Sequence, residues 1–511
     1  MSVQFVREMI ETGHILRATP QQATVEGELL LPGGLRDEVR VLHTDAAVLS
    51  AAAENTGGRV HVSGRVQFRA LYAQGDLTRV KAAETTSDFT RALTVGKADS
   101  AAEFVPQCEI TGVTARVFNG RLLLRADMNV YAEAATVQEE NVAVQIAEPD
   151  VQRLEKEIAA QRIVGGGSEH GMIRGEFEVS EVLAATEALW ADAEARVEDL
   201  IGGADGRVNV MGTMDMTVCF ASAIAGRPLV YAQYSLPFEQ SVTLSGETGD
   251  MLSAFVQIED VAVVLEESEE RKKLRAEVGL KVQAQAIREQ TVHLITDVFS
   301  TGKEQLRAEG VETSLRTRII NEQAAESGRI QMILPESAPR IKTVLAAFAK
   351  PVLAGAKEQS GRLNVDMLLR TTLIYMTEDS GIPVSHTVEE PLRLSYTSGA
   401  SPEDLLSLSA SHVEGAMVAS DRAEVRCVVT LSASGARYET AYAVTDIVPD
   451  EEMPPSGCLA LYITQPAERL WDVMKRYCLS EAAIKALNSE VAAYAKDAAL
   501  PTATRLIAYK R

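Results

Sequence analysis

One five-residue pattern occurs three times in this sequence, at separations as long as a whole domain. GRVHV at residues 58–62 returns as GRVNV at residues 206–210 and as GRLNV at residues 361–365, after steps of 148 and 155 residues. Fourteen positions after each glycine stands an aromatic residue, namely Tyr72, Phe220 or Tyr375. A repeat of this length indicates duplicated domains rather than the short units of a solenoid.

Each copy opens a stretch in which apolar and polar residues alternate, which predicts a half-buried strand. The apolar face of the first copy comprises Val60, Val62, Val66, Phe68 and Tyr72. For the opposite face we expect solvent exposure and no chemical role, and it comprises His61, Ser63, Arg65, Gln67 and Arg69. In the second copy Met214 and Met216 fall on the apolar face, so we interpret them as core residues rather than ligands of a soft metal. The chain is therefore predicted to be mainly β.

The charge of the chain is strongly and unevenly acidic. Its formal net charge is −22 and its pI is about 4.9, which argues against nucleic-acid binding through a broad basic face. Residues 459–511 carry eight Lys or Arg and five Asp or Glu, so this end has a charge of +3 against −25 for the remainder. A basic end on an acidic body predicts different partners for the two parts.

Cysteine usage and hydropathy indicate the compartment. The five cysteines are far apart and form no CxxC pattern, which predicts a reducing environment with the thiols as small apolar fillers. Residues 1–22 hold no apolar run long enough for a signal peptide, and no stretch approaches a membrane span. We therefore expect a soluble cytoplasmic protein.

Turn and linker signals divide the chain into three duplicated β-domains and a short terminal module, expected at residues 1–160, 168–315, 316–452 and 458–511. Residues 150–161 are predicted as a short charged helix, and the glycine run at residues 165–168 as a linker. Residues 295–325 are predicted as a second connection. Residues 35–49 fit either a short helix or a strand. Hairpins are expected at residues 119–120, where Asn-Gly is a strong turn signal, and at residues 419–422.

The last fifty residues differ in pattern from the rest. Tyr462 and Leu506 belong to two short predicted strands. Between them, residues 470–477 fit an amphipathic helix, and Ser480 is a good N-cap for a second helix that ends at Asn488. The predicted order is β-α-α-β. Its inward apolar residues would be Leu470, Val473, Met474, Tyr477, Ile484 and Leu487.

This terminal module resembles a LysM module. The matching residues are Tyr462, Leu470, Trp471, Asp472, Val473, Lys475, Arg476, Tyr477, Ile484, Leu487 and Asn488. LysM modules bind chains that contain N-acetylglucosamine, such as peptidoglycan or chitin. Two parts of the family pattern differ here: residues 467–469 replace its Gly-Asp-Thr, and only Leu506 and Ile507 remain of its closing motif.

The three repeats resemble the SPOCS domain of SipL-type spore coat and envelope morphogenetic proteins. The supporting segments are residues 25–32, 39–42, 118–121 and 297–300, together with the strand that follows Gly58. Tandem SPOCS-like domains that end in one LysM module are the arrangement of that family. The resemblance implies a mother-cell scaffold at the developing spore surface, whose LysM module engages the coat basement-layer ATPase, a morphogenetic protein, or another spore coat protein.

Nothing in the sequence favours an enzyme. Seven histidines are spread along the chain, and none stands at metal-ligand spacing from Cys, Asp or Glu. No nucleophile elbow, Walker loop or dinucleotide fingerprint occurs. We therefore expect no catalytic residues, no metal and no cofactor.

Two hypotheses for function follow. The first is a structural adaptor whose terminal module docks on a coat protein, and the alternative is a peptidoglycan-binding protein. The changed loop at residues 467–469, the acidic body and the absence of an export signal argue against the alternative. We expect Leu470 and Trp471 to serve packing. The candidate partner-binding residues are Glu468, Arg469, Lys475 and Arg476, for which an ordinary exposed helix and loop is the competing interpretation.

Overall fold

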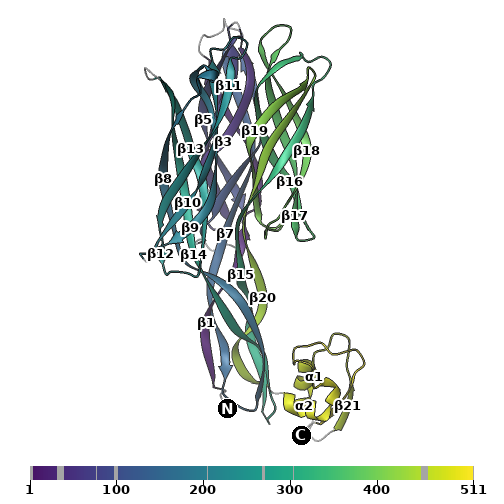
Figure 1. The fold of residues 1–511 in the computed structure, drawn as a ribbon. Helices are drawn as coiled ribbons and strands as arrows, with labels where there is room; N and C mark the ends of the chain where they lie inside the picture. The colour runs from purple at the N-terminus through teal and green to yellow at the C-terminus, as the bar shows by residue number, and fades with distance from the viewer. Residues whose placement is uncertain are drawn as a thin grey trace.

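The computed structural model of this chain is built almost entirely of strands (Figure 1). In the described part there are two α-helices, and both lie close to the C-terminus. The mainly β class predicted from the sequence is confirmed. The structure describes residues 4–31, 39–75, 77–96, 102–203, 205–267, 271–302, 304–450 and 459–509.

The first sandwich, residues 5–146, consists of two sheets that share one core. One sheet has the order β3-β4-β5, and in the other β7 pairs with β1, β2 and β6. Phe68 and Tyr72 of the Gly58 strand are buried against Leu122 and Leu124 of the facing sheet, as the alternation predicted. The strands are β1 (Phe5–Arg17), β2 (Gln21–Leu30), β3 (Val39–Asn55), β4 (Arg59–Gln74), β5 (Arg79–Thr94), β6 (Val105–Phe118) and β7 (Arg121–Ile146).

The second sandwich, residues 151–300, repeats this plan. Its sheets have the orders β9-β10-β11 and β12-β8-β14-β13. One long strand, β8, pairs with β14 along its whole length and so takes the place of β1 and β2. The strands are β8 (Val151–Glu178), β9 (Ala185–Gly202), β10 (Arg207–Ser222), β11 (Leu229–Thr243), β12 (Ser245–Gly246), β13 (Met251–Glu267) and β14 (Lys272–Ser300).

The third sandwich, residues 305–450, has sheets of order β16-β17-β18 and β15-β20-β19. The expected hairpins are present, because Phe118 pairs with Arg121 and Ala419 pairs with Arg422. The strands are β15 (Gln305–Ile333), β16 (Ile341–Gln359), β17 (Arg362–Thr377), β18 (Pro383–Tyr396), β19 (Leu405–Ala419) and β20 (Arg422–Asp450).

The repeated glycine has a backbone role in all three sandwiches. Gly58, Gly206 and Gly361 have φ of 106°, 76° and 73°, a region that residues with a side chain rarely adopt. Each glycine lies in the tight turn that starts the central strand of a three-stranded sheet, namely β4, β10 or β17. The repeated motif therefore marks a required turn.

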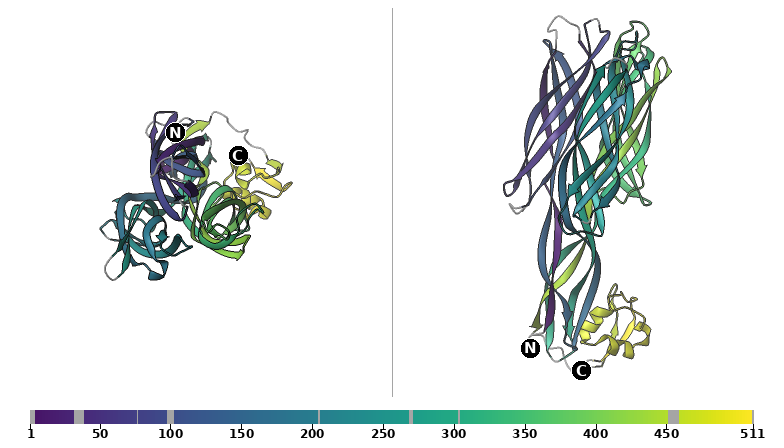
Figure 2. Two further views of the ribbon diagram at one scale, coloured as in Figure 1. Left: turned by 90° about the horizontal axis from the view of Figure 1, so that it is seen from above. Right: turned by 60° about the vertical axis from the view of Figure 1, so that its left-hand side comes forward.

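The three sandwiches surround a common axis, as the view from above shows (Figure 2). We call the part in which the three sandwiches lie around this axis the head. Below the head, three two-stranded ribbons continue (Figure 1): β1 with the end of β7, the start of β8 with the end of β14, and the start of β15 with the end of β20. The ribbons form a stalk with a core of their own. That core includes Ile10, Val142, Ile158, Val292, Leu294, Leu315, Ala441 and Ala443.

The helix predicted at residues 150–161 is wrong, because this segment is the stalk half of β8. Leu154 and Ile158 are both buried, and their spacing of four fits one face of a helix. The same spacing is even, so it also fits one face of a strand. Pairing with β14 along the whole segment decides in favour of the strand.

The linker predicted at residues 165–168 is also wrong, and the boundary expected between residues 160 and 168 falls inside β8. Gly165 and Gly167 pair with Ala286 and Ala284 of β14. A Cβ on Gly167 would lie 2.1 Å from the carbonyl oxygen of Thr243, so these glycines permit a close approach of backbone rather than flexibility.

Two other segments are strands. The connection predicted at residues 295–325 is shorter, because β14 runs to Ser300 and β15 begins at Gln305. The described end of residues 35–49 belongs to β3, which settles the open choice there in favour of a strand.

The C-terminal unit, residues 459–509, contains β21 (Leu459–Ile463), α1 (Leu470–Tyr477), α2 (Glu481–Leu487) and β22 (Arg505–Tyr509). The two strands pair with each other. Ser480 caps α2 by accepting a hydrogen bond from the Ala483 N–H, as expected. The inward position predicted for Leu487 is wrong, since this residue is exposed at the end of its short helix.

Candidate functional site

Three equivalent β-bulges lie where the sandwiches meet. At each bulge the register of the strand pair skips one leucine, namely Leu42 in β3, Leu189 in β9 and Leu345 in β16. Leu42 and Leu345 are buried in one core cluster to which all three sandwiches contribute, and Leu189 packs against that cluster. Because a bulge redirects a side chain, each repeat supplies one leucine to the shared axial core.

Next to this core, three rings come from three sandwiches. His43 stacks on Phe348 with ring centroids 3.9 Å apart, and it meets the edge of Trp190 at 5.2 Å. Burial lowers the pKa of His43 from 6.5 to about 4, against the opposing pull of Asp45 and Asp192. The imidazole is therefore neutral at physiological pH and packs as an uncharged planar ring against Phe348 and Trp190.

A partly buried ionic cluster joins the same three sandwiches, with Arg69 and Asp45 about one-fifth exposed, Lys350 34% and Asp192 50% exposed. Arg69 donates to Asp192 at 2.6 Å and to the Ala191 carbonyl at 2.8 Å, and its guanidinium lies 4.1 Å from the Trp190 ring. Lys350 donates to Asp45 at 2.5 Å, and Arg69 lies 3.4 Å from the same carboxylate. Burial acts to raise the pKa of Asp45, but the charges of Lys350 and Arg69 hold it far below its usual range. We call Asp45, Arg69, Asp192 and Lys350 the axial cluster.

The expectation that Arg69 is solvent-exposed and without a role is wrong. Its side chain is 19% exposed and pairs with two carboxylates of different sandwiches. The repeat held a signal for this: the position of Arg69 in the first copy is occupied by Thr217 and Thr372 in the others. A charged residue where two copies have threonine marks a contact that breaks the symmetry of the repeats.

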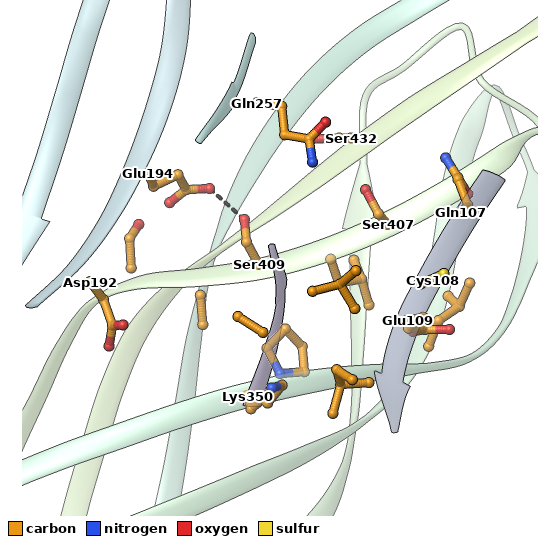
Figure 3. Close-up of a pocket in the computed structure, with 18 of the residues that line it drawn as sticks. Gln107, Cys108, Glu109, Asp192, Glu194, Gln257, Lys350, Ser407, Ser409 and Ser432 are labelled. Carbon is orange, nitrogen blue, oxygen red and sulfur yellow. Dashed lines mark hydrogen bonds between the residues drawn. The ribbon is translucent and has the colours of Figure 1, made fainter. Parts of the chain in front are cut away.

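A cavity of about 1620 Å³ extends along the axis between the sandwiches. Figure 3 shows part of its wall, with Gln107, Cys108 and Glu109 on β6 facing Ser407 and Ser409 on β19. The Ser409 hydroxyl donates to Glu194 of the second sandwich at 2.5 Å. Carboxylates, amides and hydroxyl groups are therefore interspersed in this lining with apolar side chains, such as those of Phe348, Leu405 and Val413.

Two titratable groups of this wall are shifted by their surroundings. Burial raises the pKa of Glu109, whose carboxylate also receives hydrogen bonds from the Leu353 backbone and from Asn129. Burial raises the pKa of the Cys108 thiol to about 12. Since the thiolate is the reactive form, Cys108 is a poor nucleophile.

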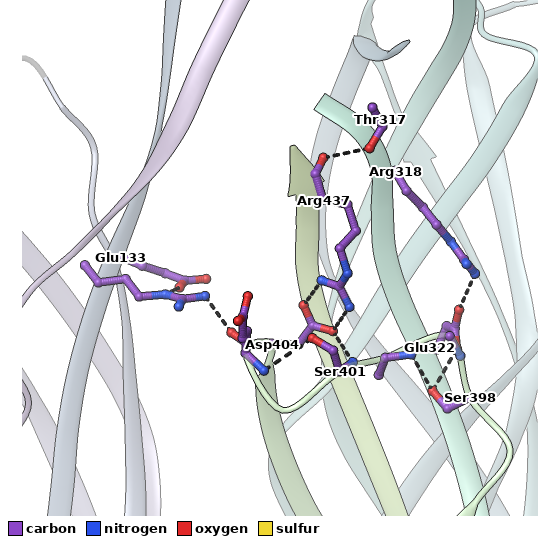
Figure 4. Close-up of polar contacts among 12 residues, drawn as sticks. Glu133, Thr317, Arg318, Glu322, Ser398, Ser401, Asp404 and Arg437 are labelled. Atoms are coloured by element: carbon purple, nitrogen blue, oxygen red, sulfur yellow. Dashed lines mark hydrogen bonds and ion pairs between the residues drawn. The ribbon is translucent and has the colours of Figure 1, made fainter. Parts of the chain in front are cut away.

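The loop before β19 is fixed by a second set of polar contacts (Figure 4). The Asp404 carboxylate accepts hydrogen bonds from two guanidinium nitrogens of Arg437, at 2.5 and 2.6 Å, and from the Ser401 N–H at 2.7 Å. Arg17 of the first sandwich donates to the Glu403 carbonyl at 2.7 Å. These bonds hold the start of one cavity wall and tie the third sandwich to the first.

The four candidate partner-binding residues lie on or just before α1, and each has a partner within the chain. Glu468 is buried and accepts from the Tyr462 hydroxyl at 2.6 Å and from the Gln465 N–H at 2.9 Å. Arg476 lies 3.3 Å from Glu468, so the structure brings these two candidates together.

The other two candidates have separate partners. Arg469 pairs with Asp472 at 2.8 Å, and the Asp472 carboxylate accepts the Arg469 N–H at 2.9 Å, which caps the start of α1. Lys475 reaches out of the unit to Asp297 on the stalk.

That stalk contact fixes the C-terminal unit in place. Asp297 accepts from the Trp471 indole at 2.8 Å and from the Lys475 ammonium at 2.6 Å. Phe299 meets the Trp471 ring edge-on at 4.9 Å. We call Asp297, Phe299, Trp471 and Lys475 the foot clamp. The packing role expected for Leu470 and Trp471 is confirmed, because both are fully buried, and Trp471 also contacts the stalk.

Within the described ranges, no group of three or more His, Cys, Asp or Glu residues is placed to hold a metal ion. No helix in the same part of the chain has the length and apolar character needed to cross a membrane.

The chain was compared with models of protein families, with curated proteins and with solved structures. None of the three comparisons returned a match.

Proposed function

We propose that this protein is a non-enzymatic scaffold in endospore coat or envelope assembly. In this proposal the three sandwiches are tandem SPOCS-like domains, and the C-terminal unit is a LysM-like module that docks on a coat morphogenetic protein, such as the basement-layer ATPase. The protein would act in the mother cell at the forespore surface. The supporting residues are those that carry the two family resemblances.

The geometry of the C-terminal unit carries the proposal. The foot clamp commits α1 to the stalk, and Figure 1 shows β21 on the side of the unit away from the stalk. The outer face of the two-stranded sheet consists of large apolar side chains that are 42–72% exposed: Leu459, Leu461, Ile463, Ile507 and Tyr509. An apolar face of this kind, presented by an anchored unit, is typical of a docking surface for another protein.

The charge around this face agrees with a protein partner. The unit carries a charge of +3 over residues 459–511, and Arg505 lies opposite Ile463 at one end of the face. An acidic partner with an apolar centre would fit it. Glu468, Arg469 and Arg476 support this role by holding the loop and the first turn of α1, while Lys475 positions the unit.

The test is binding of the purified full chain to the purified basement-layer ATPase. We expect Leu461→Glu to weaken binding at least tenfold, because a carboxylate would be buried in the centre of the contact. Glu490→Gln, on the short turn after α2, is the control and should bind as the parent chain does. Equal binding by Leu461→Glu, or sedimentation of the chain with purified peptidoglycan sacculi instead, would contradict the proposal.

A further inference from the structure

The axial cavity differs from a small-molecule pocket, and it carries an inference that is independent of the proposed coat partner. We propose that this cavity binds an extended, basic polypeptide segment, which pairs with the free edges of the strands that line it. Several lining strands face the cavity edge-on, its volume is large, and acidic residues outnumber basic ones in its lining.

Four of the lining strands present their edges to the cavity. The lining includes four runs of consecutive residues: 41–51 of β3, 105–110 of β6, 346–351 of β16, and 404–413, which begins one residue before β19 and continues in it. A strand that turns one face towards a cavity contributes every second residue to the lining, because alternate side chains point to the same face. The strand β13 does this with Ser253, Phe255, Gln257 and Glu259. Consecutive residues therefore indicate strands seen edge-on.

These four strands are also the end strands of their sheets. Each of β3, β6, β16 and β19 is hydrogen-bonded to one neighbouring strand among the described residues. The other edge of such a strand offers N–H and C=O groups in the pattern that an added strand requires. Strand addition at an exposed edge is a common way of binding a peptide.

One of these edges, and the turn that leads into another, already receive a basic side chain from another sandwich. Lys350 donates to the Ala46 carbonyl on β3 at 3.0 Å, and Arg17 donates to the Glu403 carbonyl before β19 at 2.7 Å. The Ala46 carbonyl belongs to the edge itself, and the Glu403 carbonyl belongs to the turn that leads into β19. A basic peptide segment would extend the same type of contact along the edge.

The size of the cavity favours a chain segment. Its volume of about 1620 Å³ exceeds the range of roughly 300–1,000 Å³ that is usual for small-molecule sites. Ten consecutive residues, 404–413, line it, and at a rise of about 3.3 Å per residue they span roughly 30 Å. An extended peptide matches this shape.

The charge of the lining determines the kind of segment. Five basic residues line the cavity, namely Arg69, Lys281, Arg316, Lys350 and Arg370. They face nine acidic residues, namely Asp45, Glu109, Glu133, Asp192, Glu194, Asp215, Glu259, Glu389 and Asp404. Five of these carboxylates already pair with Lys or Arg of the chain, Glu133 with Arg17 and Asp404 with Arg437 among them. The surplus therefore comes from Glu109, Glu194, Asp215 and Glu259, and it favours Lys or Arg side chains on the bound segment.

Three labelled decapeptides test the proposal with the full chain. The first alternates Lys with Val, and the second alternates Glu with Val. The third alternates Lys with Pro, whose ring removes every second N–H and fixes φ at about −65°, away from the values of about −120° to −140° in paired strands. Fluorescence anisotropy should show binding of the Lys-Val peptide at least tenfold tighter than of the other two. Equal binding of the Lys-Pro peptide would show attraction to the acidic surface alone, and no binding of the Lys-Val peptide would overturn the proposal.

Charge changes locate the binding in the cavity. Glu194→Lys should weaken binding of the Lys-Val peptide about tenfold, and Glu194→Gln should do so by a smaller factor with little effect on folding. Glu198→Lys makes the same charge change on the same strand, outside the cavity, and should leave binding unchanged. Equal weakening by Glu194→Lys and Glu198→Lys, with none by Glu194→Gln, would place the peptide elsewhere and contradict the proposal.

Discussion

The axial cluster and the foot clamp use the same chemistry in different surroundings. In the axial cluster, Arg69 and Asp45 have side chains 19% and 21% exposed, and two cations share the Asp45 carboxylate. In the foot clamp, the Asp297 carboxylate is 23% exposed, much like Asp45, but its single cation, Lys475, is 41% exposed. Breaking a buried pair leaves a charge without water or partner, whereas an exposed pair is replaced by solvent at little cost. We therefore expect the cluster to hold the head together and the clamp to act as a weaker, separable contact.

The largest effect should come from the axial cluster. Arg69→Leu leaves Asp45 with Lys350 alone and removes the guanidinium from Asp192, so we expect a loss of about 3 kcal/mol in the free energy of unfolding. Arg65→Leu on the same strand is the matched control, because Arg65 pairs with Asp88 on the open surface and should cost under about 1 kcal/mol. Urea denaturation followed by circular dichroism measures both. Equal losses of unfolding free energy in the two variants would show that burial does not decide how much an ion pair contributes to stability.

The next effect concerns the histidine between the aromatic rings. The unfolded imidazole titrates near 6.5 and the folded one at about 4, so the unfolded chain binds more protons between these values. Stability is therefore full above pH 6.5 and falls as the pH decreases towards 4. The full shift corresponds to roughly 3 kcal/mol, but His43 borders the cavity, where water lessens the penalty, and we expect about 2 kcal/mol.

His43→Phe keeps a flat ring between Trp190 and Phe348 and removes the titrating group. This variant should lose that part of the acid sensitivity, measured as the difference in thermal midpoint between pH 7 and pH 5. His61→Phe, on the neighbouring strand, should keep it. An unchanged pH profile in His43→Phe would assign the acid sensitivity to other groups.

A smaller effect is expected at the foot clamp. Asp297→Ala removes the acceptor of both Trp471 and Lys475, at a cost of about 1 kcal/mol in docking of the C-terminal unit rather than in folding of the head. Faster hydrogen exchange in α1, with unchanged exchange in the head, is the expected result. Glu309→Ala removes an exposed stalk carboxylate as a control. Restored protection in the double variant Asp297→Lys with Lys475→Asp would support the ion pair itself. Absence of restored protection would assign the clamp to the contacts of Trp471 with Asp297 and Phe299.

Local patterns in the sequence predicted the strands better than the connections between them. Alternation placed Val60 and Phe68 in the core, and helical spacing placed α1 at its observed ends. The same patterns failed at residues 150–168. Burial of every fourth residue fits helix and strand alike, and glycines that permit close strand packing resemble a flexible linker. Only the pairing of β8 with β14, more than 100 residues away in sequence, distinguishes these alternatives.

The sites were harder to predict because they depend on asymmetry between copies of one repeat. Asp45, Arg69 and Lys350 belong to two different copies, and no spacing in the sequence connects them. The foot clamp was partly visible, since Lys475 was a candidate and Asp297 lies in a segment that carried the family resemblance. Nothing local indicated that the two residues bind each other across about 180 residues.

The smallest effect on stability, yet one that separates the two sides of the C-terminal unit, is expected at Leu461. Leu461→Ala shortens a side chain that is 69% exposed, so the free energy of unfolding should change by less than about 0.5 kcal/mol. If the outer face of β21 and β22 is the partner surface, the same change should weaken partner binding several-fold, because an apolar anchor of the contact is lost. Asp297→Ala should show the opposite balance, with loosened docking and partner contacts intact at the outer face. Both variants are measured side by side. If Leu461→Ala lost stability, or if Asp297→Ala lost direct contact with the partner, the clamped and free sides of the unit would not have separate roles.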